Sequence, residues 1–240
     1  MKQRPKYLII GSGLMATHFG HYLQLLELSY KQWSRSVDSN EALIEYSKNC
    51  THILFLISDQ AIEGFIKNKP FLLKKCCVHF SGAMVIHGLF STHPLMTFSR
   101  SLYDLDTYRS IPFILEQGGP GLEELLPDLP NYAYKIPGSA KPLYHALTAM
   151  GNNFSTMLWQ HVLHRFHRDL NLPLEAIAPI LKQTAINLLE QPQNALSGPL
   201  VRGDQNTIKM HLEILADDLY KDIYQGFIKV FAKHQQEMSK

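Results

Sequence analysis

The sequence predicts an α/β domain with a doubly wound parallel sheet, followed by an all-helical C-terminal domain. Up to about residue 137, short apolar runs alternate with segments of helical periodicity. A glycine-rich turn directly follows the first of these runs. After Pro137 and Gly138, helical periods continue with almost no strand-like alternation. We therefore place the domains at residues 1–138 and 139–240.

The first strand is expected at Lys6–Ile10, an apolar run that stops at the glycine turn. Residues 14–28 carry apolar side chains at helical spacing, which predicts the first helix. An extended segment at Ser29–Trp33 and a polar helix at residues 40–48 follow. The order strand, turn, helix, strand is typical of nucleotide-binding domains.

Residues 51–58 contain five consecutive apolar side chains, from Ile53 to Ile57. Such a run is expected in a strand that is buried between two helical layers. The remaining elements of this domain are predicted as a helix at residues 59–67 and strands at 76–80, 111–115 and 132–136.

The last helix is predicted from apolar side chains at spacings of three and four residues. These side chains are Leu219, Tyr220, Ile223, Tyr224, Phe227, Ile228 and Phe231. They form either an intramolecular core or a dimer interface. Because about 100 helical residues make a thin core alone, and because paired dimers are the commonest soluble oligomers, we expect a homodimer through the helical domain.

Composition limits the class of protein. Of the 240 residues, 45% are hydrophobic and 18% charged, which excludes a disordered chain. A net charge of +2 is too small to attract nucleic acid or an anionic membrane by its field alone, so a small-molecule partner is expected. The three cysteines, Cys50, Cys76 and Cys77, form no disulfide pattern, and no run reaches membrane-spanning length. We expect a cytoplasmic protein.

Residues 11–16, Gly-Ser-Gly-Leu-Met-Ala, match the pattern G-x-G-x-x-G/A at the junction of the first strand and the first helix. The first glycine permits a tight turn, the second lets the backbone approach a diphosphate, and the small residue at position 16 lets helix and strand pack closely. The helix N-terminus then faces the phosphates. The alternative is a glycine turn without a ligand.

The end of the second strand selects the nucleotide. An NAD site places an acidic residue about 20 residues after the glycines, whereas this chain has Arg35 between Ser34 and Ser36. A guanidinium pairs with a 2′-phosphate, so NADP is predicted; the alternative is a solvated surface arginine. The expected cofactor residues are Gly11, Ser12, Gly13, Leu14, Met15, Ser34, Arg35, Ser36 and Ser58.

Four further segments occur in a recognisable order. They are His-Phe-Ser-Gly-Ala at residues 79–83, His-Pro-Leu-Met-Thr-Phe at 93–98, Leu-Tyr-His-Ala at 143–146 with Asn153 beyond, and Gly-Pro-x-x-Arg-Gly-Asp at 198–204. Together they resemble the Rossmann-like family with domain of unknown function 2520. That family is similar to the 6-phosphogluconate-type, ketopantoate and pyrroline-carboxylate dehydrogenases, so the resemblance implies an N-terminal NADP domain, a helical domain that commonly dimerises, and no particular substrate.

The resemblance also implies a proton donor, because the related dehydrogenases use a lysine early in the helical domain and an asparagine further along the same helix. Lys141 stands at the matching place, with a surface lysine as the alternative. On an ideal helix Lys141, His145 and Asn152 lie within about 40° of one another. The family pattern indicates Asn153 instead, about 120° from Lys141 on an ideal helix. Both asparagines stay open; the predicted catalytic residues are Lys141, His145 and Asn153.

Four residues are predicted to bind the substrate: Ser81, His93, Thr97 and Arg202. Ser81 follows a strand and is alternatively a helix cap, and His93 is expected in a loop after a strand. Arg202 is expected to pair with a substrate carboxylate or in a structural ion pair.

Two other sequence features are expected to be structural. Asp204 is expected to cap the helix that follows it. The histidines at 161, 164 and 167 turn about 60° from one to the next on a helix, and no carboxylate pattern accompanies them, so no metal site is predicted.

These observations predict an NADP-dependent oxidoreductase that transfers a hydride to or from a small polar C=O or C=N compound, in the cleft between the two domains. Two alternatives remain open. The first is a non-catalytic NADP-binding sensor or scaffold, and the second is a helical domain that only docks a partner.

Overall fold

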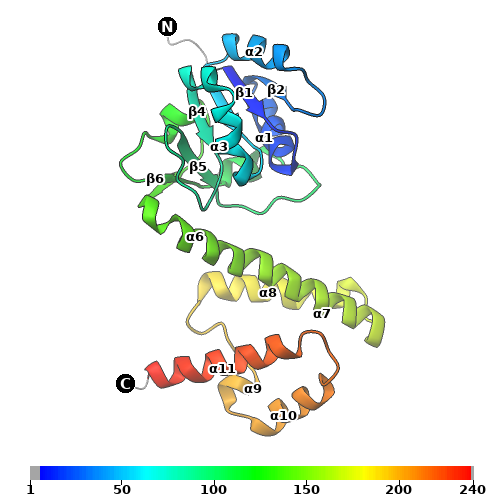
Figure 1. The fold of residues 1–240 in the computed structure, drawn as a ribbon. Helices are drawn as coiled ribbons and strands as arrows, with labels where there is room; N and C mark the ends of the chain where they lie inside the picture. The colour runs from blue at the N-terminus through cyan, green and yellow to red at the C-terminus, as the bar shows by residue number, and fades with distance from the viewer. Residues whose placement is uncertain (1–5, 239–240) are drawn as a thin grey trace. The chain divides into compact units, whose positions relative to one another are not determined.

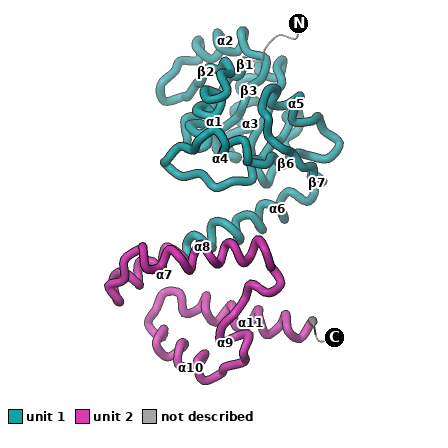
Figure 2. The backbone as a smooth tube through the Cα atoms, turned by 180° about the vertical axis from the view of Figure 1, so that it is seen from behind, with its two compact units in different colours: residues 1–158 teal, residues 159–240 magenta. Residues whose placement is uncertain are grey.

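The computed structural model describes residues 6–238, and the chain divides into two compact units, Met1–Leu158 and Trp159–Lys240 (Figure 2). The first unit holds the seven described strands and the helices up to and including the one that begins at Lys141. The domain boundary after residue 138 stays a prediction.

The first unit is built on a seven-stranded sheet (Figure 1). Its strand order is β2-β1-β3-β4-β5-β6-β7. The strands are β1 (Lys6–Ile10), β2 (Ser29–Trp33), β3 (His52–Phe55), β4 (Cys76–His79), β5 (Phe90–Pro94), β6 (Phe113–Glu116) and β7 (Ala133–Ile136). Because β2 and β3 pair with opposite sides of β1, the chain reverses direction across the sheet between β1 and β3, which is a topological switch point.

Helices cover both faces of this sheet: α1 (Leu14–Leu25), α2 (Asn40–Asn49), α3 (Asp59–Lys67), α4 (Leu105–Ser110) and α5 (Leu122–Leu125), with a 3₁₀ turn at Pro70–Lys74. After β7 come a 3₁₀ turn at Gly138–Ala140 and the helix α6 (Lys141–Thr148). Leu23 of α1 packs with Ile9 and Leu54 on one face. Leu43 of α2 packs with Leu8 and Ile53 on the other.

This alternation follows from strand geometry, because successive side chains point to opposite faces. In β3, Ile53 and Phe55 belong to one core and Leu54 to the other, and each is at most 1% exposed. The prediction of a strand buried between two helical layers is confirmed. The predicted α/β fold with a following helical region is confirmed as well.

Several details of the prediction are wrong. The sheet is not wholly parallel, since β5 pairs with β6 in antiparallel register, with His93 opposite Ile114. His93 therefore lies in a strand and not in the expected loop. The first helix ends at Leu25 rather than at residue 28, and β3 stops at Phe55 rather than at residue 58.

The second unit is helical. The element α7 (Ser155–Leu170) crosses the unit boundary and is followed by α8 (Leu174–Glu190), α9 (Pro199–Arg202), α10 (Gln205–Ile214) and α11 (Lys221–Met238). Asp204 caps α10, as predicted: its side chain accepts a hydrogen bond from the Thr207 N–H. The last helix starts at Lys221, so the expectation that Leu219 and Tyr220 belong to it is wrong.

The second unit buries few apolar side chains. Among its described residues only Ile177 and Ile208 are buried hydrophobics, at 3% and 6% exposure. Large apolar side chains remain exposed on α8 and α11, including Leu189, Phe227 and Val230. Such a unit has a thin core for its size.

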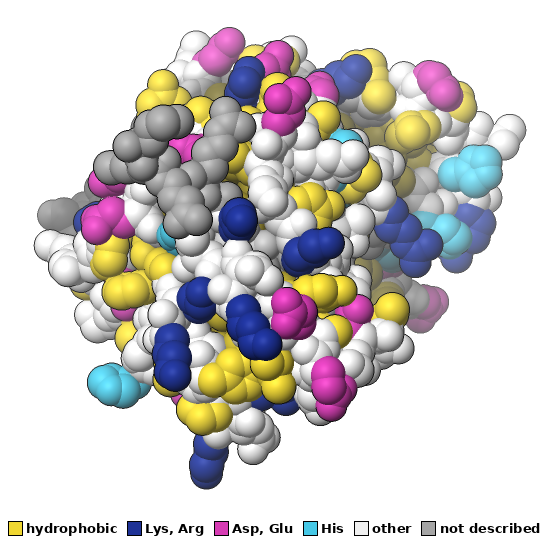
Figure 3. Space-filling model, turned by 90° about the horizontal axis from the view of Figure 1, so that it is seen from above, with side chains coloured by type: hydrophobic (Ala, Val, Ile, Leu, Met, Phe, Trp, Pro, Cys, Tyr) yellow, Lys and Arg dark blue, Asp and Glu magenta, His cyan; other side chains and the backbone are white. Residues whose placement is uncertain are grey.

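Two observations concern the surface. No described helix is long and apolar enough to cross a membrane. On the face drawn in Figure 3, basic and acidic side chains are interspersed, as the net charge of +2 leads one to expect.

The core of the first unit provides a stability test. Leu54→Ala should lower the free energy of unfolding by about 2–5 kcal/mol, because Leu54 is fully buried and the change leaves a cavity. Leu73→Ala makes the same chemical change at a site that is 44% exposed and should cost less than about 1 kcal/mol. Urea unfolding followed by Trp33 fluorescence, in a Trp159→Phe background, reports on the first unit alone. Equal losses in the two variants would contradict the assigned core.

Candidate functional site

The candidate site starts from a cavity of about 590 Å³ at the carboxyl ends of β1, β2 and β3. Seventeen residues line it: Gly11, Ser12, Gly13, Leu14, Met15, Trp33, Ser34, Arg35, Ser36, Phe55, Leu56, Ile57, Ser58, Asp59, Ala61, Phe65 and Phe80. All nine residues that the sequence predicts to bind the cofactor are among them. The cavity lies at the switch point, where open α/β sheets bind their ligands.

Gly11 shapes the turn that enters the cavity. Its φ is +132°, and a Cβ there would lie 2.1 Å from the carbonyl oxygen of Leu56. Only glycine fits both the dihedral angle and the close approach of β3. Ala16, the small residue of the motif, is fully buried, which allows helix and sheet to pack closely.

Gly13 leaves the N-terminus of α1 open. It precedes the helix without a side-chain cap, and a Cβ at this position would meet nothing within 4 Å. The free N–H groups of the first turn therefore face the cavity, together with the positive end of the helix dipole. This arrangement fits a diphosphate.

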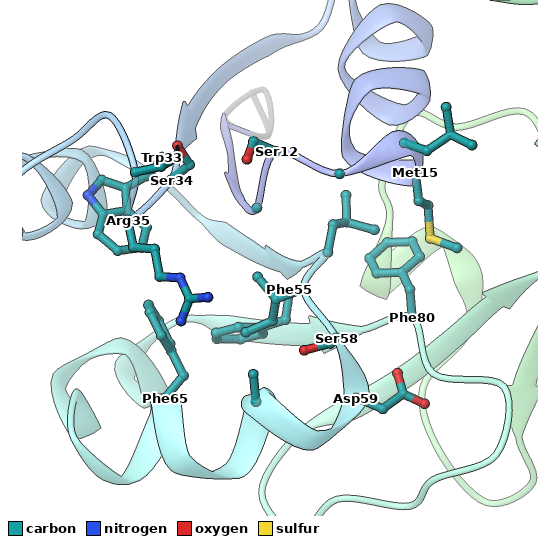
Figure 4. A pocket seen from close by; sticks show the side chains of 17 residues that line it. Ser12, Met15, Trp33, Ser34, Arg35, Phe55, Ser58, Asp59, Phe65 and Phe80 are labelled. Atoms are coloured by element: carbon teal, nitrogen blue, oxygen red, sulfur yellow. Dashed lines mark hydrogen bonds between the residues drawn. The ribbon is translucent and has the colours of Figure 1, made fainter. Parts of the chain in front are cut away.

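Arg35 stands at one end of the cavity, beyond the end of β2. Figure 4 shows its side chain extending toward Phe65 of α3. Arg35 forms no salt bridge with any residue between 6 and 238. The hydroxyl oxygens of Ser34 and Ser36 lie 3.3 Å apart beside it. A guanidinium flanked by two hydroxyls and without an acidic partner among residues 6–238 fits a phosphate monoester.

A second cluster of predicted residues forms around Gly82. A Cβ at Gly82 would lie 2.6 Å from Cδ2 of His145 and 3.0 Å from Nε2 of His93. The two imidazole rings have centroids 6.0 Å apart and nearly perpendicular planes. The glycine thus makes room for both rings, and the structure brings together two of the predicted site residues from β5 and α6.

His93 is held by Tyr144, whose hydroxyl lies 2.6 Å from Nδ1. If the hydroxyl donates, Nδ1 is the acceptor and Nε2 carries the proton toward Gly82 and His145. Burial lowers the pKa of His93 to about 4, and the neighbouring His145 and Lys141 act in the same direction. At neutral pH His93 is therefore an uncharged imidazole with one proton.

Lys141 begins α6 and is only 3% exposed, which excludes the alternative of a surface lysine. Its ammonium donates a short hydrogen bond to Ser91 Oγ and lies 3.3 Å from Oε1 of Glu116. Burial lowers the pKa of Lys141, and the Glu116 carboxylate opposes this effect. The charged ammonium of Lys141 is thus partly enclosed by Ser91 of β5 and Glu116 of β6.

The two asparagines lie in a π-helical segment, Ala149–Phe154, that interrupts the helix. The ideal-helix assumption behind their predicted angles is therefore wrong, because a π turn holds an extra residue and shifts everything after it around the helix axis. Nδ2 of Asn152 donates to Oδ1 of Asn153 at 3.1 Å. The choice between them stays a prediction.

Ser81 links the two clusters. Its hydroxyl donates a short hydrogen bond to Oδ2 of Asp59 and accepts the N–H groups of Ala83 and Met84. No helix follows Ser81, so its alternative role as a helix cap is wrong.

Sequence reasoning missed several polar residues of these clusters, namely Asp59, Ser91, Glu116 and Tyr144. For Asp59 a signal was present, because it directly follows the predicted cofactor residue Ser58. Ser91, Glu116 and Tyr144 become neighbours of the site only through the pairing of β5 with β6 and through α6.

Thr97, a predicted substrate residue, lies outside these clusters. Thr97 is exposed in the loop after β5, where its carbonyl accepts a hydrogen bond from the Tyr103 hydroxyl. Arg202 is exposed at the end of α9, in the second unit.

His161 belongs to a different cluster, in which Asp218 accepts hydrogen bonds from His161 and Arg165. Among residues 6–238 no group of three or more His, Cys, Asp or Glu side chains has the arrangement of a metal site.

Comparison with known families now adds to this geometry. Residues 115–229 match the family described as Domain of unknown function (DUF2520). This part of the chain is similar to the DUF2520 domain. This confirms the family that the motifs at residues 79–83, 93–98, 143–146 and 198–204 indicate. No curated protein matches the sequence.

Solved structures share the fold of this protein. A provisionally assigned NADP oxidoreductase from Bacteroides fragilis matches with a TM-score of 0.78 and 20% identity, over 96% of this chain and 98% of that one. An imine reductase from Myxococcus stipitatus in complex with NADP+ gives 0.64 and 14%, over 97% and 95%. Pyrroline carboxylate reductase from Plasmodium falciparum with NADP bound gives 0.59 and 12%, over 99% and 100%. The chain therefore has the Rossmann-type fold of these structures.

The buried imidazole of His93 makes stability depend on pH. Its pKa is about 4 in the folded protein and 6.5 in the unfolded chain, so the unfolded chain binds more protons between these values. The free energy of unfolding should have its highest value above pH 6.5, and it should decrease as the pH drops from 6.5 toward 4. His93→Gln should reduce this fall, as measured by urea unfolding across the pH range. An NMR titration that places the His93 imidazole pKa above 6 would contradict the assignment.

Proposed function

We propose that this protein is an NADP-dependent oxidoreductase that acts on a small polar compound with a C=N or C=O bond. One observation carries the proposal: the nine residues predicted to bind the cofactor line a single cavity at the switch point of the sheet. At one end of that cavity stands Arg35, and in its middle the uncapped N-terminus of α1. Substrate identity is left open.

Successive parts of the cavity match the 2′-phosphate, the diphosphate and the nicotinamide of NADP. Arg35 with Ser34 and Ser36 would bind the 2′-phosphate, and the N–H groups at the start of α1 would bind the diphosphate. The nicotinamide would then lie beyond the glycine turn, toward Met15, Asp59 and Phe80 (Figure 4). The similar solved structures include complexes with NADP+ and NADPH.

The names of these similar proteins favour C=N chemistry. They include imine reductase, reductive aminase and pyrroline carboxylate reductase. Reduction of such a bond needs a hydride, which the bound cofactor would supply, and a proton at the heteroatom.

His93 and His145 are the groups that we propose to move the proton. Nε2 of His93 is directed toward Gly82, and His145 stands next to it on α6. A neutral imidazole both donates and accepts a proton near pH 7. Tyr144 would act as a positioning residue, since its hydroxyl bond to Nδ1 fixes the His93 tautomer.

Lys141, Asn153, Ser81, Thr97 and Arg202 complete the proposed site. Lys141 supplies positive potential beside the two histidines, and a lowered pKa brings an ammonium closer to the range useful for acid–base work. Ser81, in the segment after β4, and Asn153, in the π-helical segment, would orient the substrate. Thr97 and Arg202 are proposed as substrate contacts on the sequence pattern alone.

A second candidate function is an NADP-binding sensor or scaffold without turnover. The enclosed ammonium of Lys141 favours it. The group that the resemblance implies as proton donor is already held by a hydrogen bond to Ser91 and a salt bridge to Glu116. Both candidates share the cofactor site. Mixing the protein with NADPH and a panel of cyclic imines and oxo acids separates them: loss of nicotinamide absorbance supports the enzyme, and its absence for every compound supports the sensor.

We also propose a homodimer and a cytoplasmic location. The second unit has exposed apolar side chains on α8 and α11, and its described residues include only two buried hydrophobics, Ile177 and Ile208. These observations support burial of the exposed side chains against a second copy of the chain. Cys50, Cys76 and Cys77 are all free thiols, as a reducing compartment leaves them.

Arg35 provides the first test of this function. Arg35→Gln should weaken NADPH binding about 10- to 100-fold, the loss expected for hydrogen bonds to a charged group, and change NADH binding little. Titration of cofactor fluorescence measures both. Arg109→Gln, which removes an exposed guanidinium from α4 outside the cavity, should leave both affinities unchanged. Equal affinity for NADPH and NADH in the unmodified protein would contradict the assignment to NADP.

The histidines provide the second test, once a substrate has been found in the panel. His145→Asn should lower kcat by about 10²–10⁴-fold, as expected for loss of a general acid or base. Tyr144→Phe should mainly shift the pH profile of kcat, because it releases the His93 tautomer without removing an imidazole. If both variants keep the unmodified kcat and pH profile, the proposed roles of the two histidines are wrong.

A further inference from the structure

We propose that Asp59 binds the nicotinamide end of the cofactor and stabilises its oxidised form over its reduced form. This inference rests on the proposed NADP site and adds a residue that neither the glycine motif nor the family motifs include. It concerns the charge of the cavity wall rather than the proton transfer.

The location of Asp59 follows from the start of α3. Asp59 is the first residue of that helix and lines the cavity together with Ser58 and Phe80. Figure 4 shows Asp59, Phe80 and Met15 on one side of the glycine turn and Arg35 on the other. A dinucleotide whose 2′-phosphate lies at Arg35 and whose diphosphate lies at the turn must place its nicotinamide toward Asp59.

The carboxylate is oriented by the chain itself. Ser81 donates its hydroxyl proton to Oδ2 of Asp59, and the hydroxyl oxygen is in turn fixed by the N–H groups of Ala83 and Met84. One carboxylate oxygen, Oδ2, is therefore bound by Ser81. The other, Oδ1, is available for the carboxamide N–H of a nicotinamide. An anion in the first turn of a helix is also a favourable placement.

The charge of Asp59 is only partly offset by a neighbouring cation, the ammonium of Lys141. In the part of the chain that the structure describes, Asp59 forms no salt bridge. The ammonium of Lys141 lies 3.3 Å from Oε1 of Glu116 and also interacts electrostatically with Asp59, so one positive charge faces two carboxylates. His93, whose pKa burial lowers to about 4, is a neutral imidazole at the pH of the test and adds no charge. One negative charge is therefore left at this end of the cavity.

The redox state of the cofactor changes the charge that faces Asp59. A nicotinamide ring carries one positive charge when oxidised and none when reduced. The Coulomb attraction to the carboxylate exists only for the oxidised ring, and it is stronger in a partly buried site than in water. The carboxamide contact, in contrast, is available to both forms.

The test compares Kd for NADP+ and NADPH by calorimetry at pH 7.5, without any substrate. Asp59→Asn keeps the shape and the acceptor oxygen but removes the charge. It should weaken NADP+ binding about tenfold and change NADPH binding by less than about threefold, so that the ratio of the two dissociation constants shifts. Asp59→Glu keeps the charge and should keep the ratio of the unmodified protein.

Two control variants separate the effect of the Asp59 charge from other effects on cofactor binding. Glu63→Gln removes an exposed carboxylate from the same helix outside the cavity and should leave the ratio unchanged. Arg35→Gln should weaken both redox forms by the same factor, because the 2′-phosphate does not change its charge. Far-UV circular dichroism checks that each variant is folded.

The outcomes distinguish the inference from the function on which it rests. If the unmodified protein binds neither nucleotide, the proposed function fails. If it binds both and Asp59→Asn weakens them equally or not at all, the function stands and the role of Asp59 is overturned. If Asp59→Asn does not fold, Asp59→Glu remains as the variant. It retains the carboxylate and should retain the ratio of the two dissociation constants, and a changed ratio in this folded variant would overturn the inference.

Discussion

The arrangement of the proposed site depends on one close approach, that of Gly11 to the carbonyl oxygen of Leu56. It places the glycine turn directly against β3 and opens the first turn of α1 toward the cavity. The conformation needs a residue without a side chain, since φ is +132° and the space for a Cβ is taken. Everything else in the cavity is arranged around this turn, with Arg35 at the end of β2 and Asp59 at the start of α3.

The local part of the fold could be predicted because it is encoded within a few residues. The runs Lys6–Ile10 and Ser29–Trp33 and the helix Asp59–Lys67 have the predicted bounds. β5 was missed because His93 is followed by Pro94, which usually excludes a central strand. The structure gives the reason: β5 pairs with β4 only at Phe90 and Ser91, so Pro94 lies past this pairing and needs no N–H on that side.

The site could be predicted only where its residues follow strand ends. The cofactor residues do so, and they line one cavity. The burial of Lys141 could not be predicted, because it depends on Ser91 and Glu116, which lie 50 and 25 positions away in the sequence. The π-helical segment at Ala149–Phe154 also has no signal in hydrophobic periodicity, and it decides which asparagine lies on which side of the helix.

The central claim is that the N-terminus of α1 binds the diphosphate of NADP, and a crystal structure of the protein soaked with NADPH tests it most directly. The account predicts diphosphate oxygens within hydrogen-bond distance of the N–H groups at residues 12–15, with the 2′-phosphate on Arg35. Density for the nucleotide at any other place, or a diphosphate that makes no contact with this turn, would contradict it.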